Sequence, residues 1–278
     1  MSTLAHTTIG LIGAGNMGQA LLKGLLASGV PAKRLQVLEA NPDTRRAVEN
    51  RFGLRATSLE TLAKKCRVVI LAVKPQDAPS VLAEFGRLVR AQPSGKILVM
   101  SIAAGLQIRA LERWLGCCPL IRVMPNLGAT VGSSISAMAW GRWVKPSHRA
   151  LAKAICESVG EVVELPERLF DTVTAVSGSG PAYFFLIFQA LRDAAVKSGV
   201  PKALAQQLVI QTAIGSTKLV DGSNGELETL IERVASKKGT TEAALRVFRQ
   251  QGLSKILQAG VLAATKRSKE LSWLLSKN

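Results

Sequence analysis

The first half of the chain alternates between short apolar runs and longer stretches in which apolar residues recur with helical periodicity. Short apolar runs bounded by turn residues are typical of buried parallel strands. The runs expected to form strands are Thr8–Ile12, Leu35–Leu38, Val68–Val73, Ile97–Ser101 and Leu120–Met124, with a weaker pair at Ser134–Ala139 and Val162–Glu164. The stretches expected to form helices between them are Met17–Ser28, Thr44–Arg51, Ala78–Val89, Ile108–Leu115 and Ser147–Val159. This alternation predicts βαβ units and a mostly parallel sheet.

The pattern changes near Pro166–Phe170, after which only helical periodicity continues. The later stretches expected to form helices are Pro181–Ser198, Lys202–Asp221, Glu226–Val234, Thr241–Gln251 and Leu253–Leu275. The segment Pro181–Val196 is apolar on nearly all sides, which implies that it is buried all round. We therefore predict an α/β domain over residues 1–167 and an all-α domain over residues 168–278, with a partner subunit covering part of the helical domain.

A glycine-rich segment follows the first predicted strand, from Ile9 to Gly18, with the spacing G-x-G-x-x-G. In such a turn Gly13 permits the tight bend, Gly15 lets the backbone approach a pyrophosphate, and Gly18 lets the helix pack on the strand. A strand before and a helix after the motif favour a Rossmann-type dinucleotide-binding domain over a glycine-rich turn without a ligand. The candidate cofactor residues here are Gly13, Gly15, Asn16, Met17 and Gly18.

The second predicted strand ends close to an acidic residue and two arginines. Glu39 lies about 20 residues after Gly18, where an acid binds the ribose 2′-hydroxyl of NADH. Arg45 and Arg46 lie one turn further and suit the 2′-phosphate of NADPH instead. Both interpretations stay open, as does that of solvated charges, and we include Glu39 and Asn41 among the candidate cofactor residues.

Three further segments follow predicted strands at the same edge of the sheet, where open α/β sheets bind ligands. They are Ala72-Val73-Lys74-Pro75, Ser101–Gly105 and Met124-Pro125-Asn126. Lys74 suits the ribose or nicotinamide side of a cofactor, although an ordinary exposed lysine is the alternative. The candidate cofactor residues at this edge are Ala72, Val73, Lys74, Pro75, Ala103 and Asn126.

Two segments in the second half have the composition of helix starts. Ser177–Pro181 places small hydroxyl residues and a proline ahead of the large apolar helix. In Ser236–Glu242, we expect Thr240 or Thr241 to cap a helix over Glu242–Phe248, with preceding N–H groups forming an anion site that fits a substrate carboxylate. Simple capping is the alternative for both segments. The candidate substrate residues are Ser236, Gly239, Thr240 and Thr241.

The net charge of +17, from 36 basic against 19 acidic residues, favours anionic partners. The basic residues are spread along the chain and aromatic residues make up only 4% of it, so an anionic cofactor and a carboxylate substrate explain the charge better than nucleic acid does. No apolar run reaches the ~20 residues of a membrane span, and the N-terminus does not have the pattern of a secretory signal. We therefore expect a cytoplasmic enzyme that does not associate with membranes.

The few histidines and cysteines limit the chemistry. With only His6 and His148, a histidine-ligated metal site or a histidine-based triad is not expected. The four cysteines form no C-x-x-C pair and are expected to be reduced structural thiols. Catalysis must then come from a cofactor, backbone donors, hydroxyls, lysines or carboxylates, and no metal is expected.

Taken together, several motifs resemble those of the pyrroline-5-carboxylate reductase family over nearly the whole chain. The segments that carry the resemblance are Gly10–Gly18, Ala72–Pro75, Ser101–Gly105, above all Val176–Tyr183, and Ala263–Leu271. The resemblance implies a Rossmann domain that holds NAD(P)H and a helical domain that forms an intertwined dimer, often assembled further into a decamer. It also implies reduction of the C=N bond of 1-pyrroline-5-carboxylate to L-proline, with the substrate between the two domains.

The resemblance assigns roles to the second helix start. The N–H groups of Gly239, Thr240 and Thr241 would hold the substrate carboxylate. The Thr241 hydroxyl would hydrogen-bond the imine nitrogen, directly or through water, and help to deliver its proton. The cofactor implied is NADPH, with NADH also accepted.

The chain departs from the family pattern at three places. The usual Pro-Gly of the substrate loop is Lys237-Lys238, and because glycine there serves a positive φ, Lys238 is expected to strain or reshape the loop. Alternatively, the two lysines add positive charge that attracts the substrate carboxylate. The family's Asn-Thr-Pro becomes Asn126-Leu127-Gly128, and Ser223–Thr229 is a few residues longer than usual. These changes keep open a related imine or 2-oxo-acid reductase, and a non-catalytic NAD(P)-binding protein.

Overall fold

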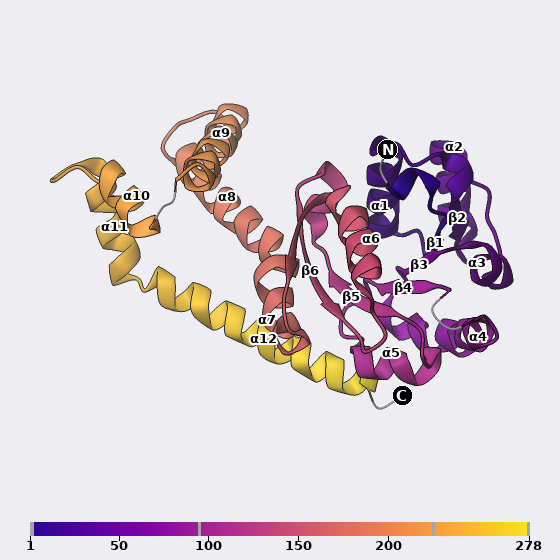
Figure 1. Ribbon diagram of the computed structural model, residues 1–278. Coiled ribbons are helices and arrows are strands. Elements are labelled where there is room, and N and C mark those ends of the chain that lie inside the picture. Colours follow the sequence, from indigo (N-terminus) through magenta and orange to yellow (C-terminus); the bar gives the residue numbers. More distant parts are fainter. Residues whose placement is uncertain (1–2, 94–95, 224–225, 277–278) are drawn as a thin grey trace. The chain divides into compact units, whose positions relative to one another are not determined.

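The protein is described by a computed structural model that covers residues 3–93, 96–223 and 226–276 (Figure 1). Contacts between its residues divide the chain into two compact units. The first unit comprises Met1–Ser179 and Ala263–Asn278, and the second comprises Gly180–Leu262. The segment Ser223–Thr229 is the one that is a few residues longer than usual in the family. Two of its residues, Asn224 and Gly225, lie outside the described residues.

The first unit is built on a seven-stranded sheet of order β2-β1-β3-β4-β5-β6-β7. The strands are β1 (Ile9–Ile12), β2 (Leu35–Leu38), β3 (Val68–Leu71), β4 (Leu98–Ser101), β5 (Leu120–Met124), β6 (Ser134–Trp140) and β7 (Gly160–Glu164). Neighbouring strands are parallel except β5 and β6. The predicted mostly parallel sheet is therefore confirmed, and the adjacent strands β1, β3, β4 and β5 bring the expected ligand-binding turns to one edge.

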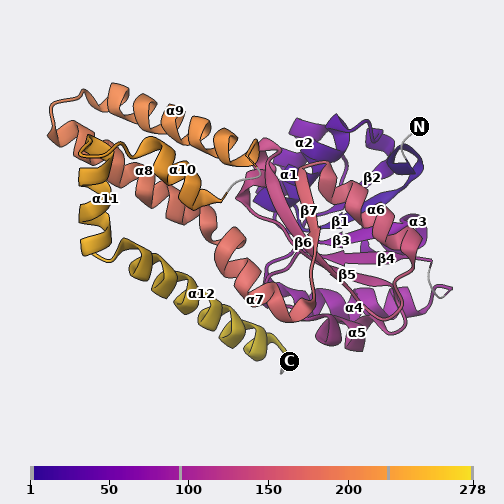
Figure 2. The same ribbon diagram turned by 60° about the vertical axis from the view of Figure 1, so that its left-hand side comes forward.

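Helices cover both faces of this sheet (Figure 2). Those of the first unit are α1 (Asn16–Ala27), α2 (Pro42–Phe52), α3 (Leu59–Lys65), α4 (Ala78–Arg90), α5 (Ile108–Leu115), α6 (Pro146–Glu157), α7 (Phe170–Val173) and the C-terminal part of α12 (Leu253–Ser276). Short 3-10 turns lie at Thr3–His6, Ala32–Arg34, Pro75–Asp77, Leu127–Val131 and Glu167–Leu169.

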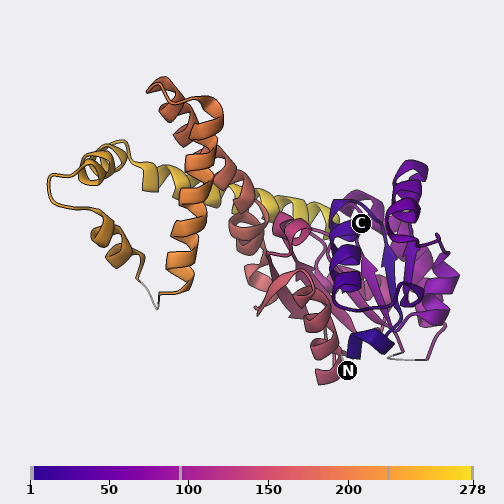
Figure 3. The ribbon, with the colours of Figure 1, turned by 90° about the horizontal axis from the view of Figure 1, so that it is seen from above.

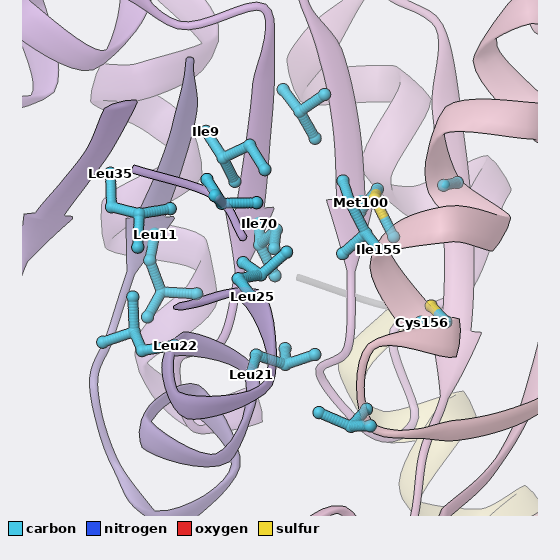
Figure 4. Packing of buried hydrophobic residues seen from close by; sticks show 14 of the residues in the cluster. Ile9, Leu11, Leu21, Leu22, Leu25, Leu35, Ile70, Met100, Ile155 and Cys156 are labelled. Carbon is cyan, nitrogen blue, oxygen red and sulfur yellow. The ribbon is translucent and has the colours of Figure 1, made fainter. Parts of the chain in front are cut away.

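The apolar side chains form one core on each face of the sheet. Figure 4 shows part of the first core, in which side chains of α1 and α6 pack against the strands. Its members include Leu11, Leu21, Leu22, Leu25, Ile70 and Ile155. The second core lies under α3, α4, α5 and α7. Its members include Leu62, Leu82, Phe85, Leu111 and Phe170. The strands are apolar on both sides because both faces are covered.

The first unit differs from the sequence expectations at β3 and at α3. The third strand ends at Leu71 rather than Val73, because the chain turns there into the 3-10 turn Pro75–Asp77. The helix α3 was not expected, since its seven residues are too short to show helical periodicity. It begins after Ser58, whose hydroxyl accepts a hydrogen bond from the N–H of Thr61 at 3.3 Å.

The segment Ser177–Pro181 was expected to be a helix start, and most of it is not. Thr174–Gly178 form a π-helical turn that follows α7, and α8 (Gly180–Lys197) begins only two residues later. The Ser177 hydroxyl donates to the carbonyl of Val173 at 3.0 Å, so it bonds back into the preceding turn instead of capping α8. Only the position of Pro181 agrees with the expected start.

The second unit consists of helices, and almost none of its residues is buried within the unit. They are α8, α9 (Lys202–Asp221), α10 (Leu227–Val234), α11 (Thr240–Gln250) and the first part of α12, and α8 packs against α9 (Figure 3). Of its described residues, only Gly180 and Ala205 are buried. Within the part of the chain that the structure describes, no helix has the length and apolar character needed to cross a membrane.

Candidate cofactor and substrate sites

The three glycines after β1 have the geometry that dinucleotide binding requires. Gly13 has φ +91°, and a Cβ there would lie 2.7 Å from the carbonyl oxygen of Ala72. A Cβ at Gly18 would lie 2.6 Å from the carbonyl oxygen of Gly13, so the helix packs too closely for any side chain. A Cβ at Gly15 would meet nothing within 4 Å, which leaves open space beside the backbone. This is the cradle that a pyrophosphate occupies.

Helix α1 begins directly beyond this open space. Gly15 is its N-cap residue, and the helix has no side-chain cap among the described residues. The first N–H groups of the helix, those of Asn16, Met17 and Gly18, are therefore available to an anion, which the helix dipole also favours. The Gln19 amide donates to the carbonyl of Ala14 at 3.0 Å and ties the turn to the helix.

Glu39 lies beside the glycine turn, as the sequence spacing suggested. Its Oε2 accepts from the N–H of Ala14 at 2.6 Å, and its Oε1 accepts from the N–H of Asn41 at 2.8 Å. Asn41 caps α2, because its Oδ1 accepts from the N–H groups of Asp43 and Thr44. The carboxylate is thus held between the two turns that border an adenosine ribose in this fold.

The remaining cofactor candidates lie along the same edge. Ala72, Val73, Lys74 and Pro75 follow β3, Ala103 follows β4, and Asn126 follows β5. Lys74 is exposed and Ala103 is buried. Asn126 caps the turn Leu127–Val131, its Oδ1 accepting from the N–H of Gly128 at 3.0 Å. The structure therefore brings the predicted residues that follow five adjacent strands, β2, β1, β3, β4 and β5, to one edge of the sheet.

A cavity of about 520 Å³ lies in the first unit next to these turns. Its lining includes Pro75 and Gln76 after β3, Ala104 and Gly105 after β4, and Ser268 of α12. This volume falls in the usual range for small-molecule sites, about 300–1,000 Å³. The cavity thus offers space for a small ligand beside the cofactor edge.

The substrate candidates form a tight turn in the second unit. The Gly239 N–H donates to the carbonyl of Ser236 at 2.9 Å, and a Cβ at Gly239 would lie 2.4 Å from the Ser236 hydroxyl oxygen. Lys238 has φ +58°, and no other non-glycine residue of the described ranges has a positive φ. The expectation that Lys238 strains this loop is confirmed.

The predicted helix cap at this loop was wrong. Gly239 is the N-cap residue, and α11 begins at Thr240, so both threonines lie in its first turn. The Glu242 carboxylate accepts from the N–H of Lys238 and stabilises the turn that a threonine cap would otherwise stabilise. The hydroxyls of Thr240 and Thr241 therefore do not cap this helix.

Burial removes the acid-base reactivity of most thiols. It raises the pKa of Cys66, Cys118 and Cys156 to about 12, so these thiols stay protonated at neutral pH. Cys117 is exposed. Across residues 3–93, 96–223 and 226–276, no group of three or more His, Cys, Asp or Glu side chains is placed to hold a metal ion.

The sequence pattern did not indicate two polar clusters near the end of the sheet. The buried Arg122 of β5 donates to the Glu167 carboxylate at 2.9 Å and lies 4.8 Å from the ring centre of Phe170. The sequence signal for this cluster was a charged residue, Arg122, within an otherwise apolar strand. The second cluster joins Asp171 to hydroxyls of α12, and no local pattern reveals it because Asp171 and Ser268 are 97 positions apart.

Comparisons with known proteins give one consistent result. Residues 167–271 match the model of the pyrroline-5-carboxylate reductase dimerisation domain, and residues 8–105 match that of the NADP oxidoreductases described as coenzyme F420-dependent. The reductase of Mycobacterium tuberculosis is 37% identical over 283 residues, covering 95% of this chain and 96% of the relative. The enzyme of Arabidopsis thaliana is 36% identical, with 95% of each chain covered.

Solved structures agree with these relatives. The Coxiella burnetii reductase superposes with a TM-score of 0.88 at 32% identity, covering 95% of this chain and 98% of that one. The Plasmodium falciparum reductase, solved with NADP bound, gives a TM-score of 0.85 at 29% identity, covering 97% and 99%. The resemblance noted in the sequence is therefore confirmed, and the chain belongs to the pyrroline-5-carboxylate reductase family.

Proposed function

We propose that this chain reduces the C=N bond of 1-pyrroline-5-carboxylate to L-proline with a reduced nicotinamide dinucleotide, the final step of proline biosynthesis. The observation that carries the proposal is the glycine turn after β1, with its open space at Gly15 and the uncapped start of α1. Similarity over 95% of the chain to reductases of this name supplies the reaction. A cytoplasmic location is also proposed, which fits the four free cysteines.

The cofactor proposed is NADPH, with NADH also accepted. The Plasmodium falciparum structure, which has NADP bound, supports this assignment. The N–H groups at the start of α1 would hold the pyrophosphate, and the turns after β3, β4 and β5 would receive the nicotinamide half. The bound cofactor supplies a hydride to the carbon of the C=N bond. The protein's own part is to position the imine and to exclude water.

The loop Ser236–Thr241 is proposed to bind the substrate. Because the Gly239 N–H already donates to Ser236, the N–H groups of Thr240 and Thr241 at the start of α11 are the donors assigned to the carboxylate. Gly239 then shapes the turn. The Thr241 hydroxyl is proposed to hydrogen-bond the imine nitrogen, directly or through water. It would help to deliver the proton that this nitrogen takes up as the carbon takes up the hydride. No strong base is required for this step.

The assembly proposed is a homodimer formed by the helical region, within a larger oligomer such as a decamer. The family's dimerisation model covers residues 167–271. Residues 1–167 are proposed as the dinucleotide-binding domain and residues 168–278 as the dimerisation and substrate-binding domain. Nucleic acid is not proposed as a partner, because an anionic cofactor and an anionic substrate already explain the net charge of +17.

The test is oxidation of NADPH and of NADH by the purified protein with 1-pyrroline-5-carboxylate, other cyclic imines and 2-oxo acids. We expect the first substrate to give the highest kcat/KM. Faster reduction of another imine or oxo acid would favour a related reductase whose substrate range has shifted, for which the Lys237-Lys238 loop and the φ of Lys238 are the motive. Cofactor binding without turnover of any substrate would favour a non-catalytic protein.

A variant tests the assigned proton donor. Thr241→Ala should lower kcat roughly ten- to a thousandfold, within the range of a single positioned proton donor or hydrogen bond. Thr241→Ser keeps the hydroxyl and should retain most of the activity. Cofactor affinity should stay unchanged in both variants, as measured by nucleotide fluorescence. If Thr241→Ala kept full kcat, the proton would have to come from elsewhere, most simply from solvent.

A further inference from the structure

The cavity of about 520 Å³ lies between the C-terminal part of α12 and the turns that follow β3 and β4. Every described residue that lines it belongs to the first unit. None of these residues belongs to the glycine motif Gly13–Gly18 or to the loop Ser236–Thr241. The sites proposed for the pyrophosphate and for the substrate carboxylate therefore leave this cavity unassigned.

Two contacts hold α12 against the rest of the first unit and fix this wall of the cavity. The hydroxyl of Ser268, which is buried and lines the cavity, donates to Oδ1 of Asp171 at 2.7 Å. Gly105 has φ +80°, and a Cβ there would lie 2.9 Å from Cδ1 of Leu275, so the end of α12 packs directly on the turn after β4. The cavity is therefore preformed, as small-molecule sites usually are.

Much of the lining is apolar. Two side chains of α12 that line the cavity, Leu271 and Leu274, are 43% and 50% exposed although they are large and apolar. The other apolar side chains of the lining are those of Pro75, Ala104, Ala264 and Leu275. A ligand with an apolar body would cover these side chains and remove their surface from water, which favours binding.

The lining contains a single charge. Among the described residues that line the cavity, only Arg267 is charged. Its Nη1 donates to the Glu270 carboxylate at 3.0 Å, but the two side chains are 62% and 46% exposed, and exposed pairs of this kind are weak. Most of the N–H donors of the guanidinium group therefore remain for a ligand. Within the described ranges, the Gln76 amide and the Ser179 hydroxyl also line the cavity and are not engaged in hydrogen bonds.

The same lining disfavours zwitterionic amino acids. No acidic side chain is among the described residues that line the cavity. An amino acid bound there would place its ammonium group in an apolar surrounding without a partner, which is costly. A simple carboxylate has no such group, and it can accept two parallel hydrogen bonds from one guanidinium group.

We propose that this cavity is a binding site for a small monocarboxylate with an apolar ring. The carboxylate binds Arg267, and the ring lies against Leu271 and Leu274. Such a ligand differs from L-proline, which carries an ammonium group. The inference does not depend on the proposed reaction, since it concerns binding in the absence of cofactor and imine.

The experiment is calorimetric titration of the full-length protein with benzoate, without cofactor or imine. We expect a dissociation constant of about 1 mM or lower. Benzamide has the same ring without the charge, and L-proline has the charge together with an ammonium group, so both should bind about tenfold or more weakly than benzoate.

Variants locate the bound carboxylate. Arg267→Gln should weaken benzoate by about tenfold or more, because it removes the charge and keeps a polar side chain. Lys266→Gln is the matched control, since Lys266 is the exposed neighbour on the same helix and does not line the cavity, and it should change the affinity by less than about twofold. Ala264→Phe places a ring inside the cavity and should abolish binding.

Four results would overturn the inference. One is no binding of benzoate up to about 10 mM. Another is an affinity that Arg267→Gln leaves unchanged. A third is loss of binding in Thr241→Ala, which would place the carboxylate at the loop Ser236–Thr241. The last is displacement of benzoate by NADPH, which would make the cavity part of the cofactor site. A failure of the proposed reaction appears separately, as benzoate binding by a protein that reduces no imine.

Discussion

At the scale of single residues, backbone conformation decides which side chains are tolerated in the two turns that are proposed to bind ligands. Gly13 has φ +91° and no room for a side chain, and the sequence motif already indicated this requirement. Lys238 has φ +58° with a full side chain in place. A left-handed conformation costs a non-glycine residue roughly 1–2 kcal/mol, so the loop Ser236–Thr241 holds strain that the contact with Glu242 helps to maintain.

Replacing Lys238 with glycine should therefore stabilise the protein. Relief of the strain exceeds the entropy that glycine adds to the unfolded chain, about 0.5–1 kcal/mol, so we expect a net gain of about 0.5–1 kcal/mol in the free energy of unfolding. Lys237→Gly is the matched control, because its φ is not positive, and it should destabilise the protein. Denaturant unfolding at one protein concentration measures both. A loss of stability in Lys238→Gly equal to that in Lys237→Gly would contradict the strain.

At the scale of elements, local periodicity predicted most strands and helices, and failed where tertiary contacts decide. The strand Leu120–Met124 and the helix Ile108–Leu115 have the expected bounds, since each shows a clear apolar pattern over its whole length. Helix α3 is too short for such a pattern. The π-helical turn Thr174–Gly178 was mistaken for a cap, because small hydroxyl residues suit both structures and composition does not distinguish them.

The same limit applies to the candidate site. The glycine motif has a fixed spacing, so the sequence predicted both its position and the role of each glycine. The hydrogen bonds of Glu39 to Ala14 and Asn41 depend on how two turns meet, so only the position of the acid could be predicted from the sequence. Contacts between distant segments, such as that of Asp171 with α12, have no local signature at all.

The contact between α7 and α12 should be a major source of stability for the C-terminal helix. The hydroxyls of Ser268 and Ser272, both buried, donate to Oδ1 of Asp171 at 2.7 and 3.1 Å. Asp171→Ala leaves two buried hydroxyls without this acceptor and should cost about 2 kcal/mol or more in the free energy of unfolding. It should also make the C-terminal helix more sensitive to limited proteolysis.

The control for this substitution is Glu157→Ala, which removes an exposed ion pair with Lys153 at 3.7 Å. Such pairs contribute about 0.5 kcal/mol or less, so Glu157→Ala should change stability little. Equal effects of the two substitutions on unfolding, with no difference in proteolysis, would show that the Asp171 contact does not hold α12.

The start of α6 should make stability depend on pH. Burial of His148, together with the positive charges of Arg67 and Lys145, lowers the pKa of this imidazole below its usual 6.5. Its Nδ1 also accepts from the N–H of Lys145 at 3.1 Å, which requires an unprotonated nitrogen. Below about pH 6.5 the unfolded chain binds a proton that the folded chain does not, so the free energy of unfolding should fall as the pH falls.

Denaturant unfolding at about pH 7.5 and about pH 5.5 measures this dependence, in a range where few carboxylates titrate. His148→Asn offers an amide oxygen to the Lys145 N–H and does not titrate, so it should reduce the loss of stability on acidification. His6→Asn, at an exposed position, is the control and should retain the full dependence. A pH dependence that persists unchanged in His148→Asn would assign it to other groups.

At the scale of the whole molecule, the two units differ in how they bury apolar surface. The first unit has a core on each face of its sheet. The second unit buries only Gly180 and Ala205 among its described residues, although α8 and α9 are rich in large apolar side chains. The nearly all-round apolar pattern of Pro181–Val196 already implied a covering partner. Exposed apolar surface of this extent marks an interface, and the family's dimerisation model matches the same region.

Charges introduced into the second unit should therefore abolish assembly without unfolding the first unit. Phe185 of α8 is 57% exposed and Leu208 of α9 is 53% exposed. We expect the unmodified protein to sediment as a dimer or a larger oligomer at micromolar concentration. Phe185→Asp or Leu208→Asp should dissociate it, because each would bury an unpaired charge at the interface.

Val131→Asp, at a 75% exposed position of the first unit, is the control and should leave the assembly intact. The glycine turn lies in the first unit, so NADPH should still bind to the dissociated variants. A stable, active monomer of the unmodified protein at micromolar concentration would contradict this account, since the second unit would then have to persist with almost no core of its own.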